Sequence, residues 1–201
     1  MKMPAADRYR ALLDAYIDAK DNNRPQRIHD VFAPDAELVF SLATANIKFP
    51  SRVTGADAIA KTLVTDFGAR YSRCRTYYVC DALQPRNGSI AALPWLVVMR
   101  EPEAGTLRIG HGVYDWTFSP AVGEAEPRVT RFHIQIARMD VIADGDARLL
   151  AQVHERLSYP WLSPVALRDE LDSLRRATPA FAFVAPFIEP AAPLVSLTSP
   201  R

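Results

Sequence analysis

The sequence has almost no excess of charge and few cysteines. Its 24 Lys and Arg residues stand against 23 Asp and Glu, which gives a formal net charge of +1. A nucleic-acid-binding surface needs a basic excess to neutralise phosphates, so this balance argues against a nucleic-acid partner. If Cys74 and Cys80 share one strand, their side chains point to the same face. At ~3.3 Å per residue they would lie about 20 Å apart, which excludes a disulfide.

Long hydrophobic runs are also missing. The longest nearly unbroken apolar run, residues 90–99, contains Pro94. It is too short to cross a bilayer. The N-terminal residues lead directly into a charged amphipathic segment, with no secretory apolar region before it. We therefore expect a cytoplasmic protein without a membrane partner.

The motifs of the common cofactor and metal classes are absent from the sequence. It contains no nucleophile elbow, no P-loop, no dinucleotide fingerprint and no zinc pattern. His29 and His154 fall on expected helices with no cysteine, histidine or carboxylate at metal-ligand spacing around them. We therefore expect neither a metal nor a cofactor.

The first part of the chain shows helical periodicity. Apolar residues recur at helical spacing on one face of the first segment: Tyr9, Leu12, Leu13, Tyr16 and Ile17. Pro25 suits the first turn of a second, short helix. Thr54–Asp57 resembles a capping box and predicts the start of a third helix, which we expect to end at Gly68. Three N-terminal helices are therefore expected.

Strand patterns dominate the next part of the chain. Apolar and aromatic residues predict strands at residues 36–42, 75–83, 90–100, 106–118 and 128–142. Turn residues separate the later strands, the last turn being centred near Gly123. Consecutive strands joined by short turns form antiparallel hairpins. The fold class is therefore α+β, with the helices packed on one face of a mainly antiparallel sheet.

The composition changes after residue 145, which predicts three regions. Residues 1–145 form the main domain, residues 146–178 a helical extension, and residues 179–201 an arm rich in proline and alanine. The five prolines in this arm exclude a regular α-helix or a central strand. Its phenylalanines are too apolar for a solvated linker, so we expect the arm to lie on a surface of its own subunit or of a neighbour.

The order of these elements resembles the NTF2-like superfamily, in particular its SnoaL-like and ketosteroid-isomerase-like branches. The residues that carry the resemblance are Phe32–Ala36, at the end of the second helix, and Thr54–Ile59, at the start of the third. The resemblance covers Tyr9 to Ile142. It implies a strongly bent sheet that wraps the helices into a cone with an apolar pocket. Members include isomerases, dehydratases, cyclases, epoxide hydrolases and non-catalytic subunits.

The two longest strands indicate which side chains face the pocket. With the turn near Gly123, Phe118 lies opposite Arg128 and His111 lies opposite Gln135. Side chains alternate between faces. One face is then aromatic and aliphatic, with glycines that leave room, and lines the interior. The other carries His111 and His133, which we expect on the outer face, although a slip of one residue would reverse the faces.

The expected ligand pocket combines this inner face with the helices and the first strand. It consists of Tyr16, Phe32, Phe40, Phe67, Gly112, Tyr114, Trp116, Phe118, Phe132, Ile134 and Ile136.

Two tyrosines are the candidate catalytic residues. The resemblance to ketosteroid isomerases places Tyr16 and Tyr114 where those enzymes keep their two oxyanion donors. A phenol can donate to a carbonyl or to a developing enolate. Phe40 falls where those enzymes keep the general-base aspartate, so ketosteroid isomerisation itself is not expected. The alternative is that both tyrosines only fill the core.

The sequence leaves two functions open. The first is binding or transformation of a small hydrophobic ligand in the cone, with help from the tyrosines in isomerase-, dehydratase- or cyclase-like chemistry. The second is a non-catalytic interaction or accessory-subunit domain that forms a homodimer through the outer sheet face, near His111 and His133.

Overall fold

The computed structural model describes residues 5–120 and 126–195. No helix within these residues is long and apolar enough to cross a membrane. The helices are α1 (Ala5–Asp21), η1 (Pro25–Arg27), α2 (Ile28–Val31), α3 (Ala56–Ala60), η2 (Lys61–Thr65), α4 (Asp66–Arg70), α5 (Arg148–Arg156), α6 (Pro164–Ala177) and η3 (Pro179–Phe187). The strands are β1 (Phe32–Leu42), β2 (Arg52–Thr54), β3 (Ser72–Val79), β4 (Ser89–Glu101), β5 (Thr106–Phe118), β6 (Val129–Ala143) and β7 (Trp161–Leu162).

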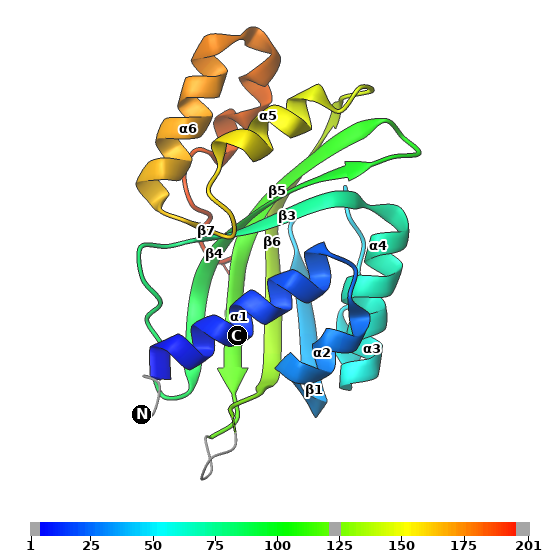
Figure 1. Ribbon diagram of the computed structural model, residues 1–201, viewed down its shortest axis with the longest axis vertical. Helices are drawn as coiled ribbons and strands as arrows, with labels where there is room; N and C mark the ends of the chain where they lie inside the picture. Colours follow the sequence, from blue (N-terminus) through cyan, green and yellow to red (C-terminus); the bar gives the residue numbers. More distant parts are fainter. Residues whose placement is uncertain (1–4, 121–125, 196–201) are drawn as a thin grey trace, which may run out of the picture.

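The strands of the described residues form one seven-stranded sheet in the order β2-β1-β6-β5-β4-β3-β7. The pairs β1–β6 and β3–β7 are parallel, and the other neighbours are antiparallel. Helices α1 to α4 lie across one end of this sheet, whereas α5 and α6 lie together at the other end (Figure 1). The α+β class with a mainly antiparallel sheet is confirmed.

The N-terminal helices bury the apolar stripes that their spacing predicts. In α1, Leu13, Tyr16 and Ile17 are buried. Helices α3, η2 and α4 run on without interruption as one helical segment (residues 56–70, the α3–α4 helix) with a π-turn in its middle. It buries Ile59 and Phe67 against the same core. This core therefore fills the space between the helices and one face of the sheet.

Two details of the third helix differ from the sequence prediction. Gly55, with a φ of 93°, is the N-cap, and no side chain caps the helix, so the predicted capping box at Thr54–Asp57 is wrong. Gly68 does not end the helix, which continues to Arg70. A Cβ at Gly68 would lie 2.8 Å from the side chain of Asn23, so this glycine permits close packing instead.

The register of β5 and β6 also differs from the predicted one. Phe118 pairs with Val129 and His111 pairs with Arg138, because the register shifts between His111 and Gly112 and again between Thr117 and Phe118. Between these shifts, Tyr114 pairs with Ile134, two positions from the predicted register. A shift of two residues keeps every side chain on its predicted face. The turn near Gly123 lies outside the described residues.

The C-terminal elements cover part of the outer face of the sheet. Leu167, Leu171 and Phe187 belong to a second apolar core with outward-facing side chains of β3, β4 and β5, namely Tyr77, Val79, Leu96, Val98, Leu107 and Ile109. The predicted arm begins as the 3-10 helix η3, whose Phe187 is fully buried. Residues 179–195 of this arm therefore lie on their own chain, while residues 196–201 lie outside the described residues.

Candidate functional site

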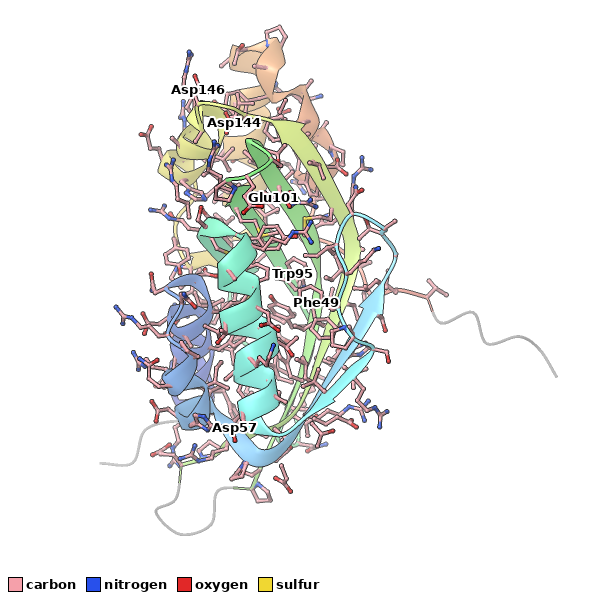
Figure 2. All side chains as sticks on the ribbon, turned by 90° about the vertical axis from the view of Figure 1, so that its right-hand side faces the viewer. Phe49, Asp57, Trp95, Glu101, Asp144 and Asp146 are labelled. Atoms are coloured by element: carbon pink, nitrogen blue, oxygen red, sulfur yellow. The ribbon has the colours of Figure 1, made fainter. Side chains whose placement is uncertain are left out.

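A small cavity lies between the inner face of the sheet and the N-terminal helices. Its volume is about 30 Å³, roughly the space of one water molecule. Figure 2 shows Phe49 and Trp95, two of its lining residues, between the α3–α4 helix and the sheet. The lining residues are Tyr16, Lys20, Phe40, Ile47, Phe49, Leu63, Phe67, Trp95, Val97, Met99, Tyr114, Ile134, Ile136 and Met139.

The structure places the predicted pocket residues at two depths. Those that line the cavity are Tyr16, Phe40, Phe67, Tyr114, Ile134 and Ile136. Those that pack in the same core away from the cavity are Phe32, Trp116, Phe118 and Phe132. The indole of Trp116 and the ring of Phe132 stack with centroids 3.6 Å apart. The narrow end of the cone is therefore filled by aromatic rings.

Gly112 lies on the inner face but leaves no free space there. A Cβ at this position would lie 1.8 Å from the carbonyl oxygen of Gln135 and 2.9 Å from the indole of Trp95. Gly112 thus permits the close approach of β6 and of Trp95, and the expectation that this glycine leaves room for a ligand is wrong. The stacked pair of Trp95 and Tyr114, with centroids 5.2 Å apart, occupies that part of the cone.

Lys20 is the charged residue of the cavity wall. Its Nζ donates to Asp21 Oδ1 at 3.0 Å and to Thr76 Oγ1 at 2.8 Å, and it lies 3.3 Å from Cys74 Sγ. Burial by itself lowers the pKa of a lysine, but the Asp21 carboxylate outweighs this effect, and the pKa of Lys20 is raised. The cavity therefore faces a permanent ammonium ion.

The Asp21 carboxylate is held on the opposite side of this ammonium. It accepts hydrogen bonds from the Thr76 amide at 2.6 Å and from the Tyr159 hydroxyl at 3.0 Å. Its side chain is 2% exposed. Burial raises the pKa of the neighbouring Cys74 thiol to about 12, so this group is neutral. The pair of Lys20 and Asp21 is consequently the only ion pair of this cluster among the described residues.

Two donors at the cavity have no acceptor at hydrogen-bond distance. The Tyr16 hydroxyl and the Trp95 Nε1 are buried and have no hydrogen-bond partner among the described residues. Burial raises the pKa of Tyr16 and of Tyr114 well above the usual value, so both phenols stay protonated. The rings of these two tyrosines meet edge to face with centroids 6.4 Å apart. Buried donors are normally satisfied, so this arrangement favours an acceptor bound in the cavity.

The cavity offers hydrogen-bond donors and a positive charge but no base. Among the described residues that line it, none carries a carboxylate or an imidazole. Within the same part of the chain, no three His, Cys, Asp or Glu side chains converge as a metal site would require. The arrangement can thus stabilise negative charge on an oxygen atom, but it has no side chain that would abstract a proton.

The segment between β1 and β2 closes the cavity. Ile47 and Phe49 line the cavity on one side and, on the other, a surface hollow of about 280 Å³ that also contains Arg70 and Tyr71. The Phe49 ring stacks on Phe40 with centroids 4.4 Å apart and an angle of 5°. Phe49 is therefore a plug between the cavity and the solvent-facing hollow.

An ion-pair chain anchors this segment. Arg108 donates to the carbonyl oxygen of Asn46, and its guanidinium pairs with Glu101 at 2.6 Å. Glu101 also pairs with Arg70 at 2.9 Å. The Asn46 side chain donates to the carbonyl oxygen of Met139 at 2.6 Å. These contacts fix the position of the segment that carries Phe49.

The two histidines of β5 and β6 lie on the outer face of the sheet. His111 packs against Phe187 of η3, with centroids 4.9 Å apart, and its Nδ1 is buried without a partner in the described residues. His133 contacts Ser41 and Asp115. Neither imidazole lines the cavity.

Lys20, Trp95 and Phe49 are site residues that were not predicted from the sequence. A signal for Lys20 was present, because it follows Tyr16 by four positions and continues the buried stripe of α1. Trp95 and Phe49 carried no such signal. Trp95 lies in a strand with apolar residues on both faces, and Phe49 lies in an irregular segment.

No protein-family model and no curated protein sequence matches the chain. Solved structures do match. The crystal structure of LinA is 12% identical, with a TM-score of 0.56 over 68% of this chain and 88% of that one. The hexachlorocyclohexane dehydrochlorinase LinA-type3 from Novosphingobium barchaimii LL02 is 11% identical, with a TM-score of 0.52 over 68% of this chain and 89% of that one.

A protein described as a member of the nuclear transport factor 2 (NTF2-like) superfamily, from Salmonella enterica subsp. enterica serovar Typhimurium str. LT2, is similar too. It is 14% identical, with a TM-score of 0.51 over 64% of this chain and 87% of that one. The chain therefore has the NTF2-like fold, as its sequence resemblance predicted.

Proposed function

We propose that the chain binds, and in the presence of a suitable substrate transforms, a small apolar molecule with a carbonyl or phenolic oxygen. The observation that carries this proposal is the set of donors on one apolar cavity: the Lys20 ammonium, the Tyr16 hydroxyl and the Trp95 Nε1. The ligand oxygen accepts from these groups while its apolar body contacts the aromatic and aliphatic walls.

Electrostatics favour a ligand oxygen that carries negative charge. In a site shielded from water, fixed donors and a fixed cation stabilise an anion far more than they would in water. Tyr16 and Tyr114 remain neutral, so both can donate. The site would therefore stabilise an enolate or phenolate, which is the intermediate of many isomerisations and eliminations.

The size of the cavity requires the plug to move. A volume of about 30 Å³ holds no organic ligand, whereas ligand pockets are ordinarily about 300–1,000 Å³. Displacement of Phe49 would join the cavity to the hollow of about 280 Å³ outside it. We infer that the described state is the closed one and that ligand entry replaces the Phe49 ring.

The similar structures support chemistry on small molecules without specifying a reaction. Two of them are LinA proteins, one of which is named a hexachlorocyclohexane dehydrochlorinase. Since no base lines the cavity among its described residues, a reaction here would use the substrate's own acidity or a solvent base, with the tyrosines and Lys20 stabilising the anion.

Binding of 4-nitrophenol tests the proposal, because its phenolate absorbs visible light. We expect the bound probe to have a lower pKa than the free probe by about one unit or more, as for an anion held by charged and neutral donors. Y16F should weaken phenolate binding about tenfold. The double variant K20M/D21N, which removes both charges together, should abolish the pKa change.

Y77F is the matched control, because Tyr77 also has a buried hydroxyl without a described partner but lies in the second core. It should bind the probe like the unchanged protein. Titrations are run on the unchanged chain and on F49A, so that closure of the plug does not conceal the site. If neither binds phenolate in preference to phenol, the proposal is wrong.

A further inference from the structure

The outer face of the sheet carries a row of three polar side chains from neighbouring strands, on the opposite side of the sheet from the cavity. Ser41 Oγ in β1 lies 2.9 Å from His133 Nε2 in β6. His133 Nδ1 lies 3.4 Å from Asp115 Oδ2 in β5. The register explains the row, since Asp115 lies directly opposite His133, and His133 lies opposite Val39, the outward neighbour of Ser41.

The 3.4 Å contact with Asp115 and the 2.9 Å hydrogen bond with Ser41 decide which imidazole nitrogen holds the proton. An ionised carboxylate only accepts, so the proton of the neutral imidazole belongs on Nδ1, which faces Asp115. Nε2 then has a free lone pair, and the Ser41 hydroxyl must be the donor to it. Burial lowers the pKa of His133, and Asp115 only partly offsets this, so the ring is a neutral base at pH 7.

The Asp115 carboxylate is itself held in place. Its Oδ1 accepts from the Ala92 amide at 2.8 Å, and its Oδ2 accepts from Gln135 Nε2 at 2.8 Å. Ala92 has a φ of 50°, in the register shift of β4, where its amide is turned toward Asp115 instead of the ladder. Gln135 in turn accepts from the Leu194 amide at 2.8 Å. Two donors, the Ala92 amide and the Gln135 side chain, therefore position Asp115.

We propose that Ser41 is an activated nucleophile that accepts acyl groups from activated esters, with His133 as its general base and Asp115 as a positioning residue. Ser41 Oγ forms a bond to the ester carbonyl carbon while its proton passes to His133 Nε2. The ester C–O bond breaks, and the leaving oxygen departs with the electron pair and takes the proton from the imidazolium. Water then releases the acyl group by the reverse proton transfers.

The surroundings of the row define the substrate class. The side chains of His133 and Asp115 are 24% and 35% exposed, so small molecules reach them from solvent. The row lies on an open sheet surface, which gives a substrate few contacts beyond the reacting atoms. We therefore expect reaction with small esters that have good leaving groups, such as aryl acetates, and slow release of the acyl group.

The test is acylation by 4-nitrophenyl acetate and labelling by a fluorophosphonate probe, with the modified residue located by peptide mass spectrometry. We expect the label on Ser41, formed at least tenfold faster than in urea-unfolded protein. S41A should remove the label, and D115N should slow it at least tenfold. The rate should rise with pH as His133 loses its proton, with a midpoint below the usual histidine pKa, and H133Q should lose this dependence.

S51A is the matched control, because Ser51 is an exposed serine close to the same strand. It should label like the unchanged chain. Circular dichroism and thermal unfolding establish that each variant is folded. A label on lysines or on His133 itself, or unchanged labelling of S41A, would overturn the proposal.

Discussion

At the scale of single residues, buried polar side chains decide what the inner cavity can bind. The sequence could predict that Lys20 is buried, because it continues the apolar stripe of α1 past Tyr16. It could not predict the partners of Lys20. Cys74 and Thr76 belong to β3, a strand distant in sequence, and only the packing of α1 against that strand brings them to the ammonium.

His154 makes a pH-dependent contribution to stability. It is buried in α5, its Nε2 lies 3.3 Å from the Val98 carbonyl oxygen, and burial lowers its pKa to about 4. In the unfolded chain a histidine has a pKa of about 6.5. Between these values the unfolded chain binds the extra proton, so stability falls as the pH falls from about 6.5 to about 4. The full loss is about 3 kcal/mol.

Urea unfolding at several pH values between 4.5 and 7 measures this effect. The difference in free energy of unfolding between the unchanged chain and H154Q should shrink steadily toward acid pH, because glutamine does not titrate. H29Q removes a histidine that is half-exposed and should leave the slope unaltered. Parallel pH curves for the unchanged chain and H154Q would contradict the assignment.

At the scale of elements, the irregular segment between β1 and β2 controls access to the cavity. Nothing in the sequence predicts a plug here, since residues 43–51 show neither helical nor strand periodicity. The register of β5 and β6 shows the complementary case. The alternation of side chains along β5 and β6 predicted which residues lie on each face of the sheet. The register shifts depend on local backbone geometry, which no residue pattern in the sequence predicts.

F49A tests the plug directly. Removing the ring opens the cavity to the outer hollow, so we expect 4-nitrophenol to associate at least tenfold faster in stopped-flow measurements. The ring is half-buried, so the expected loss of stability is about 1–2 kcal/mol, below the ~3–5 kcal/mol of a fully buried phenylalanine. F183A, a half-buried phenylalanine of η3, is the control for a nonspecific loosening and should not change the association rate.

At the scale of the whole molecule, the sheet has an apolar core on each face. The sequence predicted the inner core, because the helices and β5 carry clear periodicity. The composition of the C-terminal arm predicted that it packs on a protein surface. Composition alone does not identify that surface. In the structure, the arm packs on the outward side chains of β3 to β5 of its own chain through Phe181, Val184 and Phe187. The homodimer through the outer sheet face remains a prediction. Its interface is confined to the part of that face that residues 179–195 leave exposed.

The variant F187A tests whether the arm contributes to the stability of the folded chain. The side chain is fully buried in the second core, so we expect the free energy of unfolding to fall by about 3–5 kcal/mol in one cooperative transition. V195A alters a side chain that is 87% exposed and should have no measurable effect. Equal stabilities of the two variants would show that the arm is an independent appendage.

The covering of both sheet faces has a consequence for adaptation of this scaffold. Strands anchored from the outside depend less on the aromatic packing within, so the interior should tolerate replacement of bulky rings by smaller side chains better than a sheet with one bare face. Substitutions of these rings could then enlarge the cavity while the fold is kept. Variants of this chain could bind larger ligands.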